Sequence, residues 1–466
     1  MSNSGRLAIV ALIAATVIPG RADAADRPNV VFIVADDLGR ADCGFMGGTA
    51  IKTPNLDKLA SQGAILDAHY VQPVCSPTRA AIMTGRYPMR HGLQVGVVRP
   101  WAQYGLPLNE DTLPAMLKRA GYVTGIFGKW HLGHYRPEYL PMQRGFDRQY
   151  GHYNGAIDYF EHTRDGGFDW HSDDKVNRDE GYSTDLIGAQ AAKFVTGHAG
   201  KKPFFCYVPF NAVHTPLQAP EKYLDMYPNL VGGRRTYAAM LTAMDDAVGK
   251  IVQAVDAAGI RDNTLFVFTS DNGGPNPGKI TDNGKYRAGK GTLYEGGVRV
   301  AAFVTWQGRI TPGATVSQPL HAVDWYPTLK KLVGEKTAPA KPLDGVDIWP
   351  AITRGQSVAR SAILLNTTPN VGAIRMGDWK LIVRKGVDDP DDGEAVTKKS
   401  EESEAVVELY DLKNDPFETK NLAETERGRV AAMKARLDGF ASQAIPPKTR
   451  PRAANFVVPK VWGEKD

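Results

Sequence analysis

The sequence predicts an α/β protein with a doubly wound sheet and a smaller C-terminal α+β domain. Four short apolar runs, rich in β-branched and aromatic residues, alternate with longer helical patterns, which is the order that builds a parallel sheet. The runs are continuously apolar, so each strand is expected to be buried on both faces. Polar or ionisable residues follow all four runs, at 36–37, 129–131, 211–214 and 271–272.

The first part of the chain supplies two of the strands and two helices. Residues 30–34 form the first predicted strand. A helix opens at Thr53 as N-cap, with Pro54 in its first turn. A second helix over 112–120 precedes the second strand at 122–127.

The middle of the chain continues this alternation. Residues 135–179 are polar and rich in aromatic residues, and they are expected to form loops that cover or border a functional site of the protein. Further elements are predicted at 184–196 (helix), 204–208 (strand), 237–257 (helix), 265–269 (strand) and 298–305 (strand). Because open α/β sheets bind ligands at the carboxyl ends of their strands, the polar residues there are expected to converge.

The sequence changes character beyond about residue 355. We therefore place a catalytic domain at 25–355 and a C-terminal α+β subdomain with a small antiparallel sheet at 356–466. Its predicted elements are a hairpin over 373–383, a strand over 408–411 and a helix over 427–441. The charged stretch 388–404 is expected to be a solvated loop, and the proline-rich, basic tail after Ile445 an extended arm.

Residues 1–24 are predicted to be a signal peptide. Arg6 supplies a positive charge, 7–18 an apolar stretch too short to span a bilayer, and Ala22-Asp23-Ala24 a cleavage site. No later stretch resembles a membrane helix, so the mature protein is expected in the periplasm or secreted. A net charge of +5 without a basic tract gives no sign of a nucleic-acid partner.

Three cysteines are too few for a disulfide framework in an exported protein of this size. Cys43 and Cys206 are expected to be buried thiols, and a bond between them stays open. Cys75 differs because of the sequence around it.

Cys75 begins a short predicted helix with the pattern Cys-x-Pro-x-Arg. Pro77 suits the first helical turn, and Gly85 is placed to end the helix. The thiol would then lie at the positive end of the helix, where a lowered pKa would make it reactive, with Arg79 one turn further on the same face. A buried free cysteine beside an ordinary helix start fits the spacing about equally well.

Hard oxygen donors end two of the predicted strands, at Asp36-Asp37 and Asp271-Asn272. Three carboxylates close together would repel one another unless a cation neutralised them, and this donor set suits Ca²⁺ with ligands at about 2.3–2.6 Å. Mg²⁺ prefers a stricter octahedron, and no His/Cys set favours zinc. Taken alone, Asp36 and Asp37 could simply cap a helix or belong to a turn. The second pair, Asp271 and Asn272, at an equivalent strand end makes this alternative less favourable.

One lysine and two histidines are further candidates for chemistry at this edge. Lys129 could stabilise an anion in a transition state, and His131 and His214 could carry protons. Each of them alone would more simply be a surface lysine or a structural histidine. Residues 284–290 imitate a phosphate-binding loop, but glycine follows where Ser or Thr is needed, so a nucleotide site is discounted.

The pattern Cys-x-Pro-x-Arg at 75–79, followed by Thr-Gly-Arg at 84–86, resembles the signature of the type I sulfatases. Thr78 stands where serine is commoner. The similarity covers nearly the whole mature chain, and 87–94, 341–345 and 373–380 resemble the arylsulfatase B-like enzymes, which act on N-acetylgalactosamine 4-sulfate. The resemblance implies a sulfuric ester hydrolase with a large mixed sheet flanked by helices, of the alkaline-phosphatase-like kind.

The resemblance also implies a cofactor set and a mechanism. A maturing enzyme oxidises Cys75 to formylglycine, whose hydrated aldehyde attacks sulfur. The metal ligands implied for calcium are Asp36, Asp37, Cys75, Asp271 and Asn272. The catalytic residues implied are Cys75, Arg79, Lys129, His131, His214 and Lys290. His214 and Lys290 assist the leaving oxygen and His131 accepts the proton that releases sulfate, with the two histidine roles open to exchange.

The substrate implied is a sulfated carbohydrate, a 4-sulfate of galactose or N-acetylgalactosamine in chondroitin, dermatan or an algal galactan. The loops around Arg99, Trp101, His152, Asp158 and His162 are expected to form the sugar subsite. Asp158 or His152 could read an axial hydroxyl.

Two other functions remain open at this stage. The same metal-edge architecture resembles phosphodiester and phosphonate monoester hydrolases. A calcium-dependent binder of sulfated glycans, never matured at Cys75, is the alternative that is not an enzyme.

Overall fold

The structure, a computed structural model, describes residues 27–275, 279–366, 372–384 and 406–464. The predicted signal peptide and the charged stretch 388–404 lie outside the described residues.

A mixed sheet forms the centre of the molecule. Within the described residues its ten strands follow the order β14-β2-β13-β11-β1-β10-β4-β5-β8-β9, with β11, β1, β10, β4 and β5 parallel. The sheet contains β1 (Asn29–Ala35), β2 (Ala64–Leu66), β4 (Val123–Lys129), β5 (Arg148–His152), β8 (His171–Ser172), β9 (Lys175–Val176), β10 (Phe204–Pro209), β11 (Thr264–Ser270), β13 (Ala302–Thr305) and β14 (Ala314–Val316). The predicted α/β architecture is confirmed.

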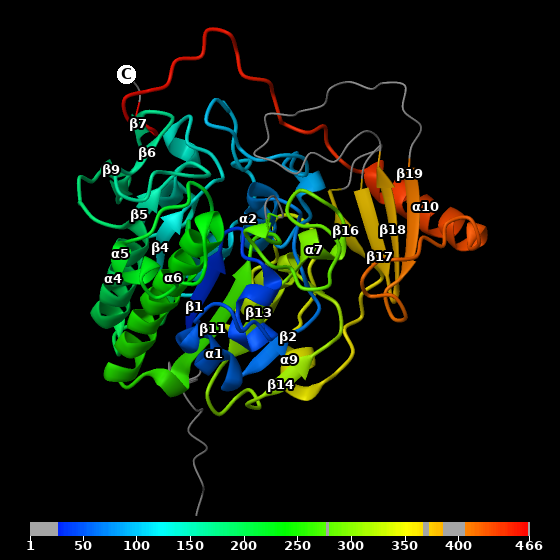
Figure 1. The fold of residues 1–466 in the computed structure, drawn as a ribbon, viewed down its shortest axis with the longest axis horizontal. Coiled ribbons are helices and arrows are strands. Elements are labelled where there is room, and N and C mark those ends of the chain that lie inside the picture. The colour runs from blue at the N-terminus through cyan, green and yellow to red at the C-terminus, as the bar shows by residue number, and fades with distance from the viewer. Residues whose placement is uncertain (1–26, 276–278, 367–371, 385–405, 465–466) are drawn as a thin grey trace, which may run out of the picture.

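Helices cover both faces of this sheet because its central strands are apolar on both sides. Alternate residues of β1 belong to different cores: Val30, Phe32 and Val34 to one, Val31 and Ile33 to the other. The first core includes residues of α2 (Cys75–Thr84), α3 (Leu113–Arg119), α8 (Trp325–Leu332) and α9 (Trp349–Arg354). The second includes residues of α1 (Pro54–Ser61), α4 (Ser183–His198), α5 (Glu221–Leu224) and α6 (Gly232–Ala257). Figure 1 shows α4 and α6 side by side on their face.

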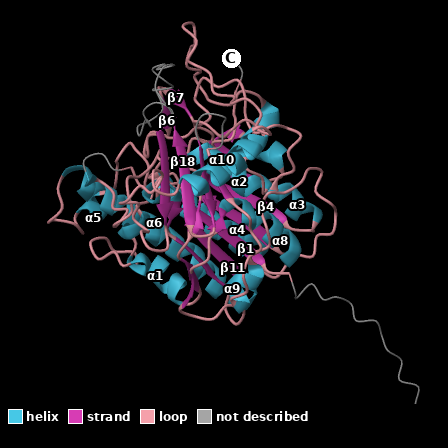
Figure 2. Ribbon diagram, turned by 90° about the vertical axis from the view of Figure 1, so that its right-hand side faces the viewer, coloured by secondary structure: helices cyan, strands magenta, loops and turns pink. Residues whose placement is uncertain are grey.

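The C-terminal subdomain is a four-stranded antiparallel sheet with one helix against it. It contains β16 (Ile363–Leu365), β17 (Gly372–Met376), β18 (Trp379–Arg384), β19 (Val406–Asp411) and α10 (Arg427–Ala441). The hairpin, the strand and the helix predicted there all form. In Figure 2 this sheet and α10 lie in front of the central sheet.

A buried cluster joins this subdomain to the central domain. Ile363, Ala373 and Ile382 pack with Leu293, which precedes α7 (Glu295–Val298), and with Val298, its last residue. The remaining strands pair in two small sheets: β3 (His69–Tyr70), β12 (Arg299–Val300) and β15 (Leu320–His321) in one, β6 (Thr163–Arg164) and β7 (Gly167–Phe168) in the other.

The tail after α10 crosses back over the central domain as an extended arm, as predicted. We call residues 445–464 the C-terminal arm. Its first part bonds to the chain at Met89 and Gly92, and its last part pairs with Phe168 of β7. In Figure 1 the arm, coloured red, runs over the top of the molecule from the C-terminal sheet to β6 and β7.

The prediction that 135–179 is loop throughout is wrong in part. The segment contains β5, which extends the parallel sheet beside β4, and β8 and β9 beyond it. No apolar run marks β5. The close approach of its backbone to β4 depends on glycine, since a Cβ on Gly151 would lie 2.3 Å from the carbonyl oxygen of Gly128.

Two other local predictions are also corrected. The strand expected over 298–305 is divided between the end of α7, β12 and β13, because the chain passes from a small sheet into the central one. Thr53 precedes α1 as expected, but its hydroxyl donates to Asp57 (3.0 Å) and makes no cap hydrogen bond.

Cys43, Cys75 and Cys206 are all buried and form no disulfide, so the expectation of buried thiols at positions 43 and 206 is confirmed. Among the described residues, no helix is both long enough and apolar enough to span a membrane.

Candidate active site

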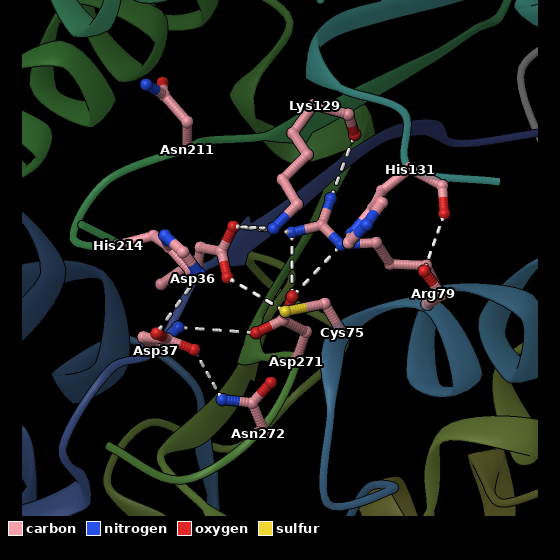
Figure 3. A network of polar contacts seen from close by, with 12 residues as sticks. Asp36, Asp37, Cys75, Arg79, Lys129, His131, Asn211, His214, Asp271 and Asn272 are labelled. Carbon is pink, nitrogen blue, oxygen red and sulfur yellow. Dashed lines mark hydrogen bonds and ion pairs between the residues drawn. The ribbon is translucent and has the colours of Figure 1, made fainter. Parts of the chain in front are cut away.

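Four adjacent strands bring the predicted site residues to one edge of the sheet. In the register of the sheet, Ala35 at the end of β1 is opposite Ser270 at the end of β11. β10 and β4 continue the same parallel set. The segments that follow these strands therefore meet, as Figure 3 shows.

The helix α2 presents Cys75 to this edge. Cys75 is its first residue and Gly85, with a φ of 66°, ends it, so the helix forms as predicted. The thiol is 2% exposed and donates to the Asp36 carboxylate at 3.4 Å.

The predicted lowering of the Cys75 thiol pKa is wrong for this environment. Burial raises this pKa well above its usual value, and the negative charges of Asp271 and Asp36 raise it further, against the smaller opposite effects of Lys129 and Lys290. The position at a helix N-terminus does not outweigh desolvation and two carboxylates.

Arg79 connects three of the strand ends. Its Nε and Nη2 donate to one carboxylate oxygen of Asp271 at 3.0 and 2.8 Å, and its Nη1 donates to the carbonyl of Lys129 at 2.9 Å. Nη2 also lies 3.4 Å from Asp36. Both Arg79 and Asp271 are at most 1% exposed, so this pairing fixes the geometry of the edge.

The acidic residues form a buried group that suits a divalent cation. Ligand atoms of Asp36, Asp37, Cys75 and His214 all lie within 4.8 Å of one another. Asn272 donates to Asp37 at 2.7 Å, while its own buried Oδ1 has no hydrogen-bond partner in the described part of the chain. A buried, unpartnered amide oxygen beside two carboxylates fits an oxygen-preferring metal ion.

Asp271 pairs with Arg79 beside the group of converging ligand atoms. Its carboxylate faces Arg79, and its other oxygen accepts from the Asp37 N–H at 3.4 Å. It lies beside the ligand group and is not one of the four residues whose ligand atoms converge. Its role as a ligand stays a prediction.

Lysines neutralise this cluster. Lys129, fully buried, bonds to Asp36, and Lys290 donates to Asp37 at 2.9 Å. Burial opposes the charge of Lys290, but Asp37 and the other negative groups outweigh it and raise the lysine pKa. Burial also opposes the charge of Asp36, yet the positive charges of Lys129 and Arg79 hold its pKa below the usual range.

Both predicted histidines lie at the edge with one ring nitrogen bonded to backbone. His131 Nε2 lies 3.1 Å from the Val98 carbonyl, and its buried Nδ1 has no partner among the described residues. His214 Nδ1 donates to the Thr215 carbonyl at 2.7 Å, which leaves Nε2 to accept from Lys290 at 3.1 Å. Burial lowers the pKa of both rings. Nearby cations lower it further, although Asp37 and Asp36 oppose this at His214. At pH above the ordinary imidazole pKa of 6.5 both rings are therefore neutral, and His131 Nδ1 can accept a proton.

The predicted sugar-subsite residues lie in two groups. Arg99 and Trp101 belong to the loop that follows Val98, and His152, Asp158 and His162 belong to the end of β5 and the segment after it. Arg99 lies over the ring of Trp101, 5.8 Å from its centroid, on the loop that follows Val98. His152, fully buried at the end of β5, stacks with Trp170. Asp158 accepts from the N–H groups of its own turn and from Gln218. His162 also stacks on Trp170, with ring centroids 4.3 Å apart. Sugar binding by these residues stays a prediction.

Sequence reasoning missed the residues that position the histidines. Ser76 donates to the His131 carbonyl at 2.9 Å and accepts from the Val98 N–H at 3.0 Å. The Tyr159 hydroxyl donates to the His214 carbonyl at 2.8 Å. Gly155 lies directly against the His131 ring. No local sequence signal marks these contacts, because each joins distant segments.

Residues 28–335 match the family model described as Sulfatase. The chain belongs to the sulfatase family. Arylsulfatase J of Mus musculus is 35% identical to it over 483 residues, covering 94% of this chain and 80% of that protein. N-acetylgalactosamine-6-sulfatase of Mus musculus is 34% identical over 385 residues, covering 77% of this chain and 72% of that protein.

A solved structure of similar size also matches this sulfatase. The crystal structure of Ps i-CgsB in complex with k-i-k-neocarrahexaose has a TM-score of 0.81 and 34% identity, covering 90% of this chain and 94% of that one. The resemblance to the type I sulfatases is confirmed at the level of the family, and the protein is a sulfuric ester hydrolase. The finer likeness to arylsulfatase B-like enzymes stays a prediction.

Proposed function

We propose that this sulfatase removes sulfate from a sulfated galactose or N-acetylgalactosamine in a polysaccharide or its oligosaccharides, with formylglycine at position 75 and Ca²⁺ beside it. The observation that carries the proposal is the placement of Cys75. It opens α2 in the middle of a buried cluster of carboxylates, lysines and histidines from four strand ends. A hydrated aldehyde at this position supplies an oxygen nucleophile and a second hydroxyl through which the ester on the enzyme can be released.

The donor set supports calcium as the cation. Asp36, Asp37 and Asn272 would hold it through oxygen, with side chain 75 and the neighbouring Asp271 and His214 around them. The ion would supply positive charge that favours a deprotonated nucleophile and polarises the sulfate group.

Three buried cations suit the other charges of the sulfuryl group. Lys129, Lys290 and Arg79 each pair with a carboxylate of the cluster and are at most 11% exposed at the side chain. Because they are fixed before substrate arrives, they would stabilise charge that develops in the transition state with little reorganisation.

The two histidines divide the proton transfers. His131 is neutral with a free Nδ1, which fits a group that accepts a proton from residue 75. His214 and Lys290 share a hydrogen bond 3.1 Å long, and this pair would deliver a proton to the leaving sugar oxygen.

The names of relatives favour a carbohydrate substrate. One relative is an N-acetylgalactosamine-6-sulfatase, and the matched crystal structure holds a neocarrahexaose. We therefore favour a galactan or a galactosaminoglycan, and the 4-sulfate position rests on the sequence resemblance. Residues 1–24 support export to the periplasm or the medium, where such polymers occur.

The decisive experiment combines mass spectrometry with a sulfate-release assay. Protein co-expressed with a formylglycine-generating enzyme should yield a tryptic peptide spanning position 75 that is about 18 Da lighter than the cysteine form. The same preparation should release inorganic sulfate from 4-nitrophenyl sulfate and from a panel of defined sulfated mono- and oligosaccharides, and lose this activity in EGTA.

Cys75→Ala should abolish release, while Cys206→Ala, at a buried thiol in β10, should retain both the modification and the activity. Faster turnover of 4-nitrophenyl phosphate than of the sulfate would favour a phosphate or phosphonate ester hydrolase. An unmodified, inactive protein that still binds sulfated sugars with calcium would favour the glycan binder.

A further inference from the structure

A cavity of about 900 Å³ lies between the loop 100–104 and the C-terminal arm. Its volume falls in the range of about 300–1,000 Å³ that ligand pockets occupy. None of the catalytic residues proposed above lines it. It is therefore a site additional to the cluster around Cys75.

The arm forms one wall of this cavity because it is anchored at both ends. The Lys448 N–H donates to the Gly92 carbonyl at 2.8 Å, and the Trp101 indole donates to the Arg450 carbonyl at 3.0 Å. At the other end Trp462 donates through its backbone N–H to Phe168 at 2.9 Å. Between these anchors the arm passes over the central domain in Figure 1.

The lining combines aromatic rings with positive charge. Trp101, Tyr104 and Tyr135 line the cavity, and Tyr135 is 52% exposed. Lys448 and Arg450 also line it, together with the acidic Glu464. The Arg450 guanidinium donates to the backbone carbonyls of Pro447 and Thr449 at 3.1 and 2.9 Å. Apolar ring faces and an excess of positive charge fit sugar rings that carry sulfate groups.

Two backbone segments of the proposed active site continue into the cavity wall. The segment 131–134 runs alongside 98–100: His131 contacts the Val98 carbonyl, and His134 contacts the Pro100 carbonyl at 3.0 Å. Pro100 and His134 are both cavity residues. One stretch of four residues thus leads from the proton acceptor to the cavity wall.

We propose that this cavity binds further sugar units of a sulfated polysaccharide chain while one unit is held at the Cys75 cluster. The inference rests on the proposed function and adds the arm to the binding surface. It predicts that affinity grows with chain length and with sulfation, because Lys448 and Arg450 meet sulfates on units beyond the one that is cleaved.

Binding can be measured without turnover in the full-length Cys75→Ala variant by isothermal titration calorimetry. The probes are di-, tetra- and hexasaccharides of carrageenan and of chondroitin 4-sulfate, and the desulfated hexasaccharides. The hexasaccharide of the preferred series should bind more tightly than its disaccharide. Adding Lys448→Ala and Arg450→Ala should weaken hexasaccharide binding about three- to tenfold and remove most of the preference for length.

Two further variants separate charge from other effects. Lys201→Ala with Lys202→Ala removes two exposed charges before the amino end of β10, far from the arm, and should retain the preference for length. Exchange of the pair as Lys448→Arg with Arg450→Lys retains both charges and should also retain it.

Equal affinity for disaccharide and hexasaccharide, or hexasaccharide binding unaffected by the double alanine variant, would overturn the proposal. Desulfated hexasaccharide that binds as tightly as the sulfated one would overturn it too. A different result would show that the proposed function itself is wrong. In that case the matured wild-type protein would release no sulfate from any ester, whatever the calorimetry shows.

Discussion

Gly155 sets the position of the His131 ring. A Cβ at residue 155 would lie 2.4 Å from His131 Cε1 and 2.5 Å from Nε2, closer than real contacts allow. The ring cannot yield freely, because its Nε2 is held 3.1 Å from the Val98 carbonyl. Gly155, which is far in sequence from the signature motif, thus leaves the space that the ring of His131, the proposed proton acceptor, occupies.

We therefore expect Gly155→Ala to lower kcat/KM for 4-nitrophenyl sulfate about 10- to 100-fold, because a displacement near 1 Å at a reacting group can cost about 100-fold. Steady-state kinetics and a melting curve of the matured enzyme measure this. Gly197→Ala in α4, where an added Cβ meets nothing within 4 Å, is the control and should gain about 0.5–1 kcal/mol of stability. Similar activity in the two variants would show that Gly155 does not position His131.

The start of α1 depends on a contact from another helix. The N–H groups of Asn55 and Leu56 donate to the Asp245 carboxylate of α6 at 3.0 and 2.8 Å, and the Asn55 side chain donates to it at 2.8 Å. Burial raises the pKa of Asp245 to about 6, although these hydrogen bonds oppose the rise. Asp245 takes the capping role that the sequence assigns to Thr53.

Asp245→Ala should destabilise the protein by about 1–3 kcal/mol, since buried N–H groups of α1 lose their acceptor. Urea unfolding followed by circular dichroism measures the change. The neighbouring Asp246→Ala, which removes only a hydrogen bond from Tyr223 at an exposed carboxylate, should cost less than about 1 kcal/mol. Equal losses in the two variants would contradict the capping role.

At the scale of the whole molecule, a buried ionic contact joins the two subdomains. Lys380 of β18 donates to Glu295 of α7 at 2.9 Å and lies 2.9 Å from Glu418, and all three are at most 1% exposed. The Glu295 N–H also donates to Glu418. Burial raises the pKa of Glu418 to about 7, with Glu295 adding to the rise against the opposite effect of Lys380.

This pKa gives the stability a definite pH dependence. Because the folded-state pKa of Glu418 (about 7) exceeds its ordinary value of 4.5, the protonated group stabilises the fold below about pH 4.5, and this contribution is lost as pH rises through 7. Glu418→Gln stays neutral throughout. Relative to wild type, it should therefore gain roughly 1–3 kcal/mol between pH 5 and pH 8, at about 1.36 kcal/mol per pKa unit.

Urea unfolding at the two pH values measures this difference. Glu424→Gln, at an exposed position in the same segment, should show no such gain. A difference between wild type and Glu418→Gln that is the same at pH 5 and pH 8 would contradict the shifted pKa.

The sequence by itself determined the strands β1, β4, β10 and β11, the helix α2 and the polar residues that follow the strands. These features depend on local composition: continuous apolar runs, a proline in a first turn and a glycine at a helix end. The rule that parallel strands share a carboxyl edge then predicted that the polar residues after these strands converge, and the family resemblance added Cys75 to them.

Only the tertiary structure decided the features that depend on distant partners. These are the strand β5 within 135–179, the capping of α1 by Asp245, the raised pKa of the Cys75 thiol, and the path of the C-terminal arm over the cavity. In each case the deciding energy is burial or a hydrogen bond between segments far apart in the chain, and no local pattern of residues records which segments will meet.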